Sequence, residues 1–413
     1  MEVIKRDGRK QEFSCVKVYT AIVNACEAVD KEITEESKEL AFKISKAIGE
    51  MNKTMTVEEI QDIIEKKLMS SSRKDVAKAY IIYREERTRE RERNSPFLKD
   101  ARKRAKATDV QNQNANVDEK SFGGRKGEAD AELMKTLAFE IMSDKARRNH
   151  IWNRIYTHDL DSYYVGMHNC LTVPLDDLLK NGFNTRQTDV RPANSVNTAM
   201  QLIAVIFQIQ SLQQFGGVSA SHIDWTLVPY VRKSFCKHYK NGMTYIEELG
   251  LEDFENGYIT DKTPITSELY TKFNKAYKYA YNMTVKEIYQ ATEGLFHNLN
   301  TLQSRSGNQL PFTSINYGTC TLEEGRLITK AILDTSIKGI GKNHRTSVFP
   351  CQIFQIMRGV NKEPNTPNYD LYQLALKSTA KRLYPNYANV DWSTNEGYDK
   401  NDPDTYVSTM GKV

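Results

Sequence analysis

The first residues of the chain place apolar and polar positions in the pattern of a β-hairpin. Val3 and Ile4 are followed by a charged Lys-Arg-Asp-Gly-Arg run, and an apolar residue returns at Phe13. Asp-Gly is a preferred central pair of two-residue hairpin turns. We therefore expect a hairpin with a tight turn centred on Asp7 and Gly8.

Helical patterns follow the hairpin. Ser14 stands at the N-cap position before a run whose apolar residues recur at helical spacing. Thr56, with a glutamate three residues later, forms a capping box ahead of a second such run. A charged run then predicts a solvent-exposed helix in which Glu85 and Arg89 pair one turn apart. Residues 1–93 are therefore predicted to form a compact, mainly helical unit.

A polar segment separates this unit from the rest of the chain. Residues 94–129 show little apolar periodicity and contain the turn-forming pair Gly123-Gly124, so we expect a linker that leads into the next region. Over 130–413, helical patterns alternate with short apolar runs. Helices are expected at about 130–148, 194–214, 265–302 and 368–384, and strands at 171–173, 312–317 and 348–357. Such alternation is typical of a mixed α/β sheet or barrel.

Composition and charge narrow the class of protein. Of 413 residues, 39% are hydrophobic and 27% are charged, which is typical of a folded multidomain protein. The net charge of +5 is a small excess of 58 basic over 53 acidic residues, so we expect local phosphate sites and no direct DNA binding. No apolar run approaches the roughly 18 residues that span a bilayer, and the N-terminus lacks the apolar core of a signal peptide. We therefore expect a cytoplasmic protein that contacts no membrane.

The basic hairpin is a first candidate site. Lys5, Arg6 and Lys17 could gather three positive groups around a polyphosphate. Charge alone also fits an exposed basic hairpin, because surface lysines and arginines are common. The chain carries, in order, Val-x-Lys-Arg-Asp-Gly-Arg from Val3, then Phe13 and Lys17, Thr56-Val57-Glu58-Glu59-Ile60, and Ala79-Tyr80-Ile81-Ile82-Tyr83-Arg84. This ordered set resembles the ATP-cone family.

The ATP-cone resemblance implies a regulatory domain that binds ATP or dATP as allosteric effectors and regulates a ribonucleotide reductase. It implies phosphate contacts from Lys5, Arg6 and Lys17. The nucleoside-side positions are Val3, Thr56 and Val57, and the turn residues Asp7 and Gly8 belong to the same site. ATP-cones also occur on a transcriptional repressor of reductase genes, so this domain alone does not identify an enzyme.

Cys170 is the candidate catalytic residue. The six cysteines contain no CxxC pair, so we expect no metal site in this chain. A lone cysteine in apolar surroundings is often an inert side chain. The motifs around it are Tyr156-Thr157-His158-Asp159, Asn169-Cys170-Leu171, Pro192-Ala193-Asn194-Ser195, Gln214-Phe215-Gly216-Gly217, His222-Ile223-Asp224 and Pro311-Phe312-Thr313-Ser314-Ile315-Asn316-Tyr317-Gly318. In this order they resemble the anaerobic (class III) ribonucleotide reductases over nearly the whole chain.

This second resemblance implies an incomplete glycyl-radical-enzyme-type α/β barrel after the mainly helical ATP-cone. Within it, Cys170 would supply a hydrogen atom during reduction of the 2′-carbon of a ribonucleoside triphosphate. The family also builds a dimer interface from helices such as the one expected at 194–214, which implies a homodimer.

Five further residues are candidates for the substrate pocket. Asn169 adjoins the candidate thiol. His158 and Asp159 are candidates for polar groups that line the pocket, and a structural histidine with satisfied hydrogen bonds is the alternative. Asn194 and Ser195 stand at a helix N-terminus, where they either receive the triphosphate or cap the helix.

The last residues depart from the family pattern. The family places its radical-bearing cysteine directly after Met-Gly, whereas Met410-Gly411 is followed here by Lys412. We therefore expect the radical cysteine, the glycyl radical and a zinc site only in a missing C-terminal part. A separate C-terminal reductase chain or splicing would supply that part, and a radical-SAM activating enzyme would act on the complete enzyme.

Two functions remain open from the sequence. The chain is either the N-terminal portion of an anaerobic ribonucleoside-triphosphate reductase, inactive alone, or a catalytically silent ATP/dATP-binding regulatory fragment. A truncated product without a role is a third alternative. The electron donor, formate or a thiol system, also stays open.

Overall fold

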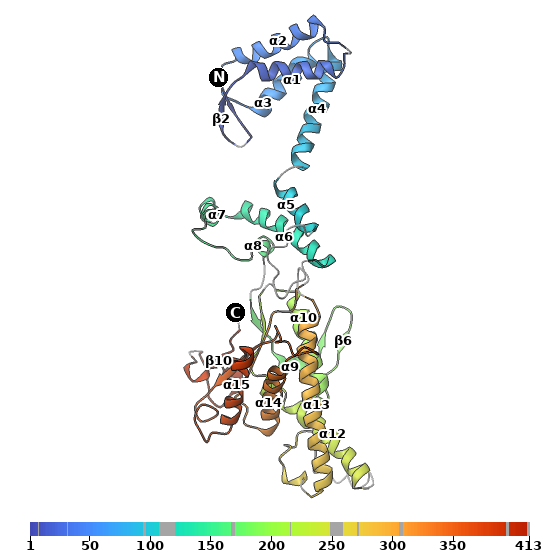
Figure 1. Cartoon of the computed structure of the whole chain (residues 1–413), viewed down its shortest axis with the longest axis vertical. Coiled ribbons are helices and arrows are strands. Elements are labelled where there is room, and N and C mark those ends of the chain that lie inside the picture. Colours follow the sequence, from blue (N-terminus) through green and yellow to red (C-terminus); the bar gives the residue numbers. More distant parts are fainter. Residues whose placement is uncertain are drawn as a thin grey trace. The chain divides into compact units, whose positions relative to one another are not determined.

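The computed structural model describes residues 1–6, 8–30, 32–93, 96–106, 120–166, 170–214, 216–247, 259–270, 272–304, 309–393 and 396–410. The chain divides into two compact units, Met1–Asp100 and Ala101–Val413 (Figure 1). The division falls inside the segment 94–129 that the sequence indicates as a linker. None of the described helices combines the length and the apolarity required to cross a membrane.

The first unit is a helical bundle attached to a small sheet. The sheet has the order β2-β1-β3, with β1 antiparallel to β2 and parallel to β3. The elements are β1 (Glu2–Ile4), β2 (Lys10–Glu12), β3 (Met55–Thr56), α1 (Cys15–Glu27), α2 (Glu35–Glu50), α3 (Val57–Met69) and α4 (Lys74–Arg93). Its core is apolar and includes Val3, Ile22, Ile48 and Leu68. The predicted mainly helical unit with a hairpin is therefore confirmed.

The predicted two-residue turn of the hairpin is wrong. The Lys5 N–H donates to the Arg9 carbonyl at 2.8 Å, and the Gly8 N–H donates to the Lys5 carbonyl at 2.9 Å. Three residues therefore lie between the paired positions. Gly8 has φ +80°, a left-handed conformation that glycine adopts without steric cost. Asp7 lies outside the described residues.

The predicted helix starts are confirmed in two different ways. Ser14 is the N-cap of α1, although its side chain makes no cap hydrogen bond. At the start of α3, the Glu59 N–H donates to Thr56 Oγ1 at 3.1 Å, and the Thr56 N–H donates to Glu59 Oε2 at 2.7 Å. This reciprocal pair is a complete capping box. On the exposed helix α4, Arg89 pairs with Glu85 at 2.9 Å, as predicted.

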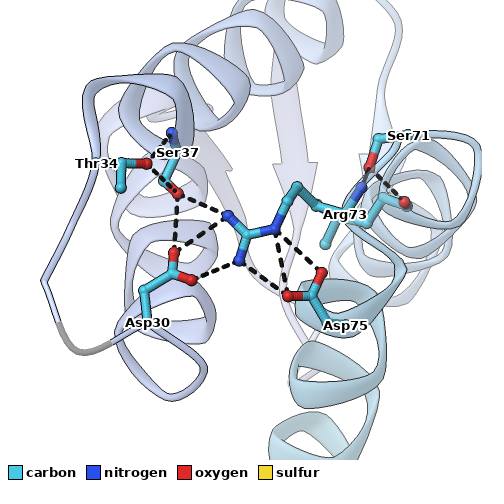
Figure 2. Close-up of polar contacts among 7 residues, drawn as sticks. Asp30, Thr34, Ser37, Ser71, Arg73 and Asp75 are labelled. Carbon is cyan, nitrogen blue, oxygen red and sulfur yellow. Dashed lines mark hydrogen bonds and ion pairs between the residues drawn. The ribbon is translucent and has the colours of Figure 1, made fainter.

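Arg73 ties three helices of this unit together (Figure 2). Its guanidinium donates to Asp30 at 2.7 Å, to Ser37 Oγ at 3.0 Å and to Asp75 at 3.0 Å. Asp30 follows α1, Ser37 lies in the first turn of α2, and Asp75 lies in the first turn of α4. The Arg73 hydrogen bonds are the largest cause that lowers the pKa of Asp30. The cluster therefore fixes the helix ends relative to one another.

The second unit begins with helices. These are the end of α5 (Pro96–Ala105), α6 (Phe122–Ile141), α7 (Asp144–Ile151) and the short α8 (Leu160–Tyr163). The pair Gly123-Gly124, predicted as a turn, lies inside α6. The Ser121 side chain accepts the Gly124 N–H at 3.0 Å, and this N-cap satisfies a first-turn donor that the helix itself leaves unpaired.

A five-stranded parallel sheet forms the centre of the second unit. Its order is β10-β9-β8-β7-β4, and every pairing is parallel. The strands are β4 (Leu171–Thr172), β7 (Val218–Ala220), β8 (Thr313–Tyr317), β9 (Cys351–Ile356) and β10 (Asn386–Asn389), beside a small hairpin of β5 (Phe183–Asn184) and β6 (Asp189–Val190). The mixed α/β class is confirmed. In the described part of the chain the strands form no closed barrel, which agrees with the expected incomplete barrel.

Helices connect and cover these strands. They are α9 (Leu175–Asn181), α10 (Val196–Ser211), α11 (Ile223–Thr226), α12 (Val228–Ile246), α13 (Asn274–Thr301), α14 (Glu323–Lys338) and α15 (Tyr369–Arg382), with 3-10 turns η2 (Glu268–Tyr270), η3 (Val390–Trp392) and η4 (Pro403–Thr405). The long helix α13 packs along α12 and α10 (Figure 1). One continuous apolar core lies between these helices and the sheet.

Candidate functional site

The hairpin of the first unit borders a basic cavity. A hollow of about 550 Å³ is lined by Lys5, Arg6, Arg9, Lys10, Gln11 and Val57. Its volume lies in the range of small-molecule sites, roughly 300–1,000 Å³. Four of the six lining residues carry a positive charge, so the cavity is suited to an anionic ligand.

Contacts with α3 position one of these cations. Arg6 Nε lies 2.5 Å from Glu58 Oε1, and Arg6 Nη2 donates to Gln61 Oε1 at 3.2 Å. Lys10 pairs with Glu2 across the hairpin at 3.2 Å. The cavity is thus built from one hairpin and the first turns of one helix.

The other predicted nucleotide-site residues have varied positions. Lys17 is exposed on α1 and does not belong to the cavity lining, whereas Val57 does. Val3 is buried in the core of the unit, and Thr56 is engaged in the capping box. Sequence reasoning did not select Arg9 and Lys10 as ligands, although both belong to the charged hairpin.

Cys170 lies directly before the edge strand β4. The Gly217 N–H donates to Cys170 Sγ at 3.3 Å, and the Leu171 N–H donates to the Gly217 carbonyl at 3.1 Å. The buried Gln214 side chain donates to that same carbonyl at 2.7 Å. The structure therefore brings together two motifs, around Cys170 and at Gln214 to Gly217, that lie more than 40 residues apart in the chain.

Gly217 allows little room for a side chain. A Cβ atom at this position would lie 3.1 Å from the Phe312 ring, closer than most such contacts in proteins. The close approach of this loop to β8 keeps the amide that faces the Cys170 sulfur in place.

The remaining substrate-pocket candidates form local contacts. Ser195 caps α10 by accepting the Thr198 N–H at 3.1 Å, and Asn194 Oδ1 lies 3.4 Å from Thr198 Oγ1. His158 Nδ1 and Asp159 Oδ2 hydrogen-bond to each other in the connection before α8, where the His158 side chain is 64% exposed. Asn169 lies outside the described residues.

The segment 407–409 lies against the sheet at β7, β8 and β9. The buried Asn316 side chain donates to the Ala220 carbonyl at 2.9 Å and to the Thr409 carbonyl at 3.0 Å, and it accepts the Thr409 N–H at 3.2 Å. Gln355 donates to the Val407 carbonyl at 3.2 Å. Sequence reasoning missed both amides. Gly411 and Lys412, on which the expectation about the radical cysteine depends, lie outside the described residues.

A fully buried carboxyl group anchors the loop after β8. Asp224 Oδ2 accepts the N–H groups of Gly318 and Cys320, each at 2.9 Å. Burial raises the pKa of Asp224. Asn361 and Asn368 each donate to the Gly318 carbonyl, at 2.9 Å and 3.1 Å. The loop at the carboxyl end of β8 is therefore fixed from both sides.

Comparison with known proteins identifies the class to which this arrangement belongs. Residues 1–89 match the ATP cone domain, and residues 113–411 match the anaerobic ribonucleoside-triphosphate reductases. The protein is thus a ribonucleotide reductase homologue with an ATP-cone. More specifically, the chain belongs to the anaerobic ribonucleoside-triphosphate reductase family, as the sequence motifs indicate.

Individual relatives extend over most of this chain. It is 33% identical to the anaerobic ribonucleoside-triphosphate reductase of Haemophilus influenzae, over 94% of this chain and 52% of that protein. The Escherichia coli enzyme of the same name is 32% identical, over 94% of this chain and 51% of that protein. The chain spans about half the length of these curated relatives. The anaerobic ribonucleotide reductase of Thermotoga maritima, in complex with dATP and CTP, aligns with a TM-score of 0.45 and 14% identity over 66% of this chain and 43% of that one.

Proposed function

We propose that this chain is the N-terminal portion of an anaerobic reductase that converts ribonucleoside triphosphates to deoxyribonucleoside triphosphates under ATP/dATP control. The observation that carries the proposal is the position of Cys170, whose sulfur accepts the amide of Gly217 at the start of the sheet's edge strand. Family membership supports the reaction class.

The hydrogen bond to Cys170 suits a thiol that supplies a hydrogen atom. The Gly217 N–H donates to the sulfur, so this contact uses a sulfur lone pair and not the S–H hydrogen of Cys170. The sulfur is half-buried in a position braced by Gln214, so its direction is defined by the fold. We therefore assign to Cys170 the role of supplying a hydrogen atom during reduction of the ribose 2′-carbon.

The effector site belongs to the first unit. Arginine and lysine side chains are the common protein ligands of phosphate groups, and Lys5, Arg6, Arg9 and Lys10 surround one cavity. The proposal assigns the phosphates of ATP or dATP to this cavity and the nucleoside to the side of Val57. In this assignment, Lys17 has a weaker contribution than the sequence motif implies.

The decisive experiment measures dCTP formation from CTP under strict anaerobic conditions. The assay contains this chain, a chain that corresponds to the second half of the relatives, and the radical-SAM activating enzyme. Cys170→Ser should abolish dCTP formation and leave dATP binding unchanged. Cys15→Ser, which alters an exposed cysteine of the other unit, is the matched control. Turnover by Cys170→Ser would contradict the catalytic assignment.

A second function is favoured by one observation. All the described residues that line the basic cavity lie within Met1–Asp100, so nucleotide binding there would not depend on catalysis. The chain would then be a silent ATP/dATP-binding regulator, which either associates with an intact reductase or forms the proposed homodimer. Mixing this chain with a chain that corresponds to the second half of the relatives distinguishes the two proposed functions. A reductase half gains turnover in this mixture, and a silent regulator does not.

A further inference from the structure

Three residues distant in sequence meet at the carboxyl ends of β4 and β7. Asp176 lies in the first turn of α9, His222 follows β7, and Asp404 lies in the 3-10 turn η4. His222 Nε2 is 2.9 Å from Asp176 Oδ2 and 3.2 Å from Asp404 Oδ1. All three ligand atoms lie within 4.8 Å of one another.

We propose that Asp176, His222 and Asp404 form a binding site for one divalent metal ion, such as Mn²⁺ or Zn²⁺. Such ions bind nitrogen and oxygen ligands at about 2.1 Å, which places adjacent ligands of an octahedral ion roughly 3.0 Å apart. The separations of His222 Nε2 from Asp176 Oδ2 and Asp404 Oδ1, 2.9 Å and 3.2 Å, are close to this value. An ion therefore requires only small movements of two carboxylates that reach solvent.

Neighbouring hydroxyl groups orient two of the three ligands. Ser221 Oγ lies 2.9 Å from His222 Nδ1, which leaves Nε2 as the ligating nitrogen when Nδ1 carries the proton. Thr226 Oγ1 donates to Asp176 Oδ2 at 3.1 Å. Outer hydrogen bonds of this kind accompany protein ligands in metal sites.

The third ligand lies on a fixed turn. Thr405 Oγ1 donates to the Asp399 carbonyl at 2.9 Å and accepts the Asp399 N–H at 2.9 Å. The adjacent Asp404 N–H donates to Asp402 Oδ1 at 3.1 Å. The turn that presents Asp404 is therefore held by its own hydrogen bonds.

Charge and burial also suit a divalent ion. His222 is nearly buried, with a side chain 6% exposed, whereas the Asp176 and Asp404 side chains are 53% and 78% exposed. Two carboxylates and a neutral imidazole supply two negative charges on one side of the ion, and water completes its coordination on the other. The bound ion would hold η4 against β7 and α9, next to the segment that Asn316 binds across the sheet.

Metal binding can be measured on the purified chain without turnover, so this test does not depend on the proposed reductase function. The free Mn²⁺ signal in electron paramagnetic resonance should fall by one equivalent per chain. Asp176→Asn and Asp404→Asn should each weaken Mn²⁺ binding at least about tenfold, since loss of an outer partner alone has such an effect. Asp177→Asn, which alters the neighbouring exposed carboxylate of α9, should bind like the unaltered chain.

Hydrogen exchange provides the second readout. Mn²⁺ should slow amide exchange over 403–409 in the unaltered chain and not in Asp404→Asn, which changes an exposed turn and leaves the core intact. No Mn²⁺ binding, or binding that Asp404→Asn does not weaken, would overturn the proposal and leave a hydrogen-bonded cluster only.

Discussion

Thr56 closes the capping box of α3 with its side chain, and it is also one of the residues proposed for the nucleoside side of the effector site. Thr56→Ala should destabilise the first unit by about 1 kcal/mol, the usual cost of losing an N-cap. Thr56→Ser keeps the hydroxyl and should retain the stability. Urea unfolding, monitored by amide hydrogen exchange in α3, measures the difference in the free energy of unfolding between the two variants. Equal stability of the two variants would contradict the capping role.

Glu287 confers an acid-sensitive contribution to the stability of the second unit. Burial alone would raise the pKa of Glu287, but the hydrogen bonds from His238 at 2.8 Å and Ser234 at 3.2 Å lower it overall. A lowered folded-state pKa means that the stabilisation is complete above the unfolded-state value, about 4.3, and is lost as the pH falls through the folded-state value.

Glu287→Gln should therefore be less stable than the unaltered chain at neutral pH, with the difference shrinking as the pH falls below about 4. Tryptophan fluorescence, to which Trp225 just before α12 contributes, follows the unfolding in urea at each pH. A difference in stability that is independent of pH would show that the hydrogen-bonding shape of Glu287, and not its charge, is responsible.

Single residues also show why the candidate site was only partly predictable. Cys170 could be selected because its motif is local in the sequence. Its partner Gly217 and the amide of Asn316 could not, because their contacts join segments more than 40 and 90 residues apart. The three proposed metal ligands share the same difficulty, since no local spacing connects positions 176, 222 and 404.

At the scale of secondary-structure elements, the residue types in each strand or helix determined whether the sequence predicted it. The strands β8 and β9 were predictable because they combine isoleucine with aromatic residues, Ile315 and Tyr317 in β8 and Ile353 and Phe354 in β9, and such residues are enriched in strands. β10, with the sequence Asn-Tyr-Ala-Asn, is a short edge strand with a single residue of this kind. The helix α14 was missed because it buries polar residues as well as apolar ones, including Glu324, Thr329 and Ser336, so its pattern lacks a clear polar face.

The strand β8 holds the segment 407–409 through one side chain. Asn316→Ala would remove the partners of the Thr409 N–H and of the Ala220 and Thr409 carbonyls. The expected loss is about 1–3 kcal/mol, the cost of leaving a buried polar group unsatisfied. Thermal unfolding should shift downward, and amide exchange of 407–409 should accelerate.

Asn300→Ala is a suitable comparison for this loss. Asn300, a half-buried residue of α13, likewise holds a distant loop with its side-chain amide, through the Val348 N–H at 2.8 Å. It should destabilise the unit without a selective effect on 407–409. Equal acceleration in the two variants would show that Asn316 has no specific role in binding this segment.

On the scale of the whole molecule, the proposed effector site belongs to Met1–Asp100 and the candidate thiol belongs to Ala101–Val413. A ligand that binds only the folded state stabilises it by about 2.7 kcal/mol at a concentration one hundred times its Kd. dATP should therefore slow amide exchange in the hairpin and at the start of α3, and Lys5→Gln together with Arg9→Gln should abolish this protection. Lys135→Gln, on α6 of the second unit, is the matched control.

Regulation further requires a coupling free energy between the two sites, so dATP must change CTP affinity by the same factor by which CTP changes dATP affinity. Protection confined to the first unit together with unchanged CTP affinity would show effector binding without regulation by this chain.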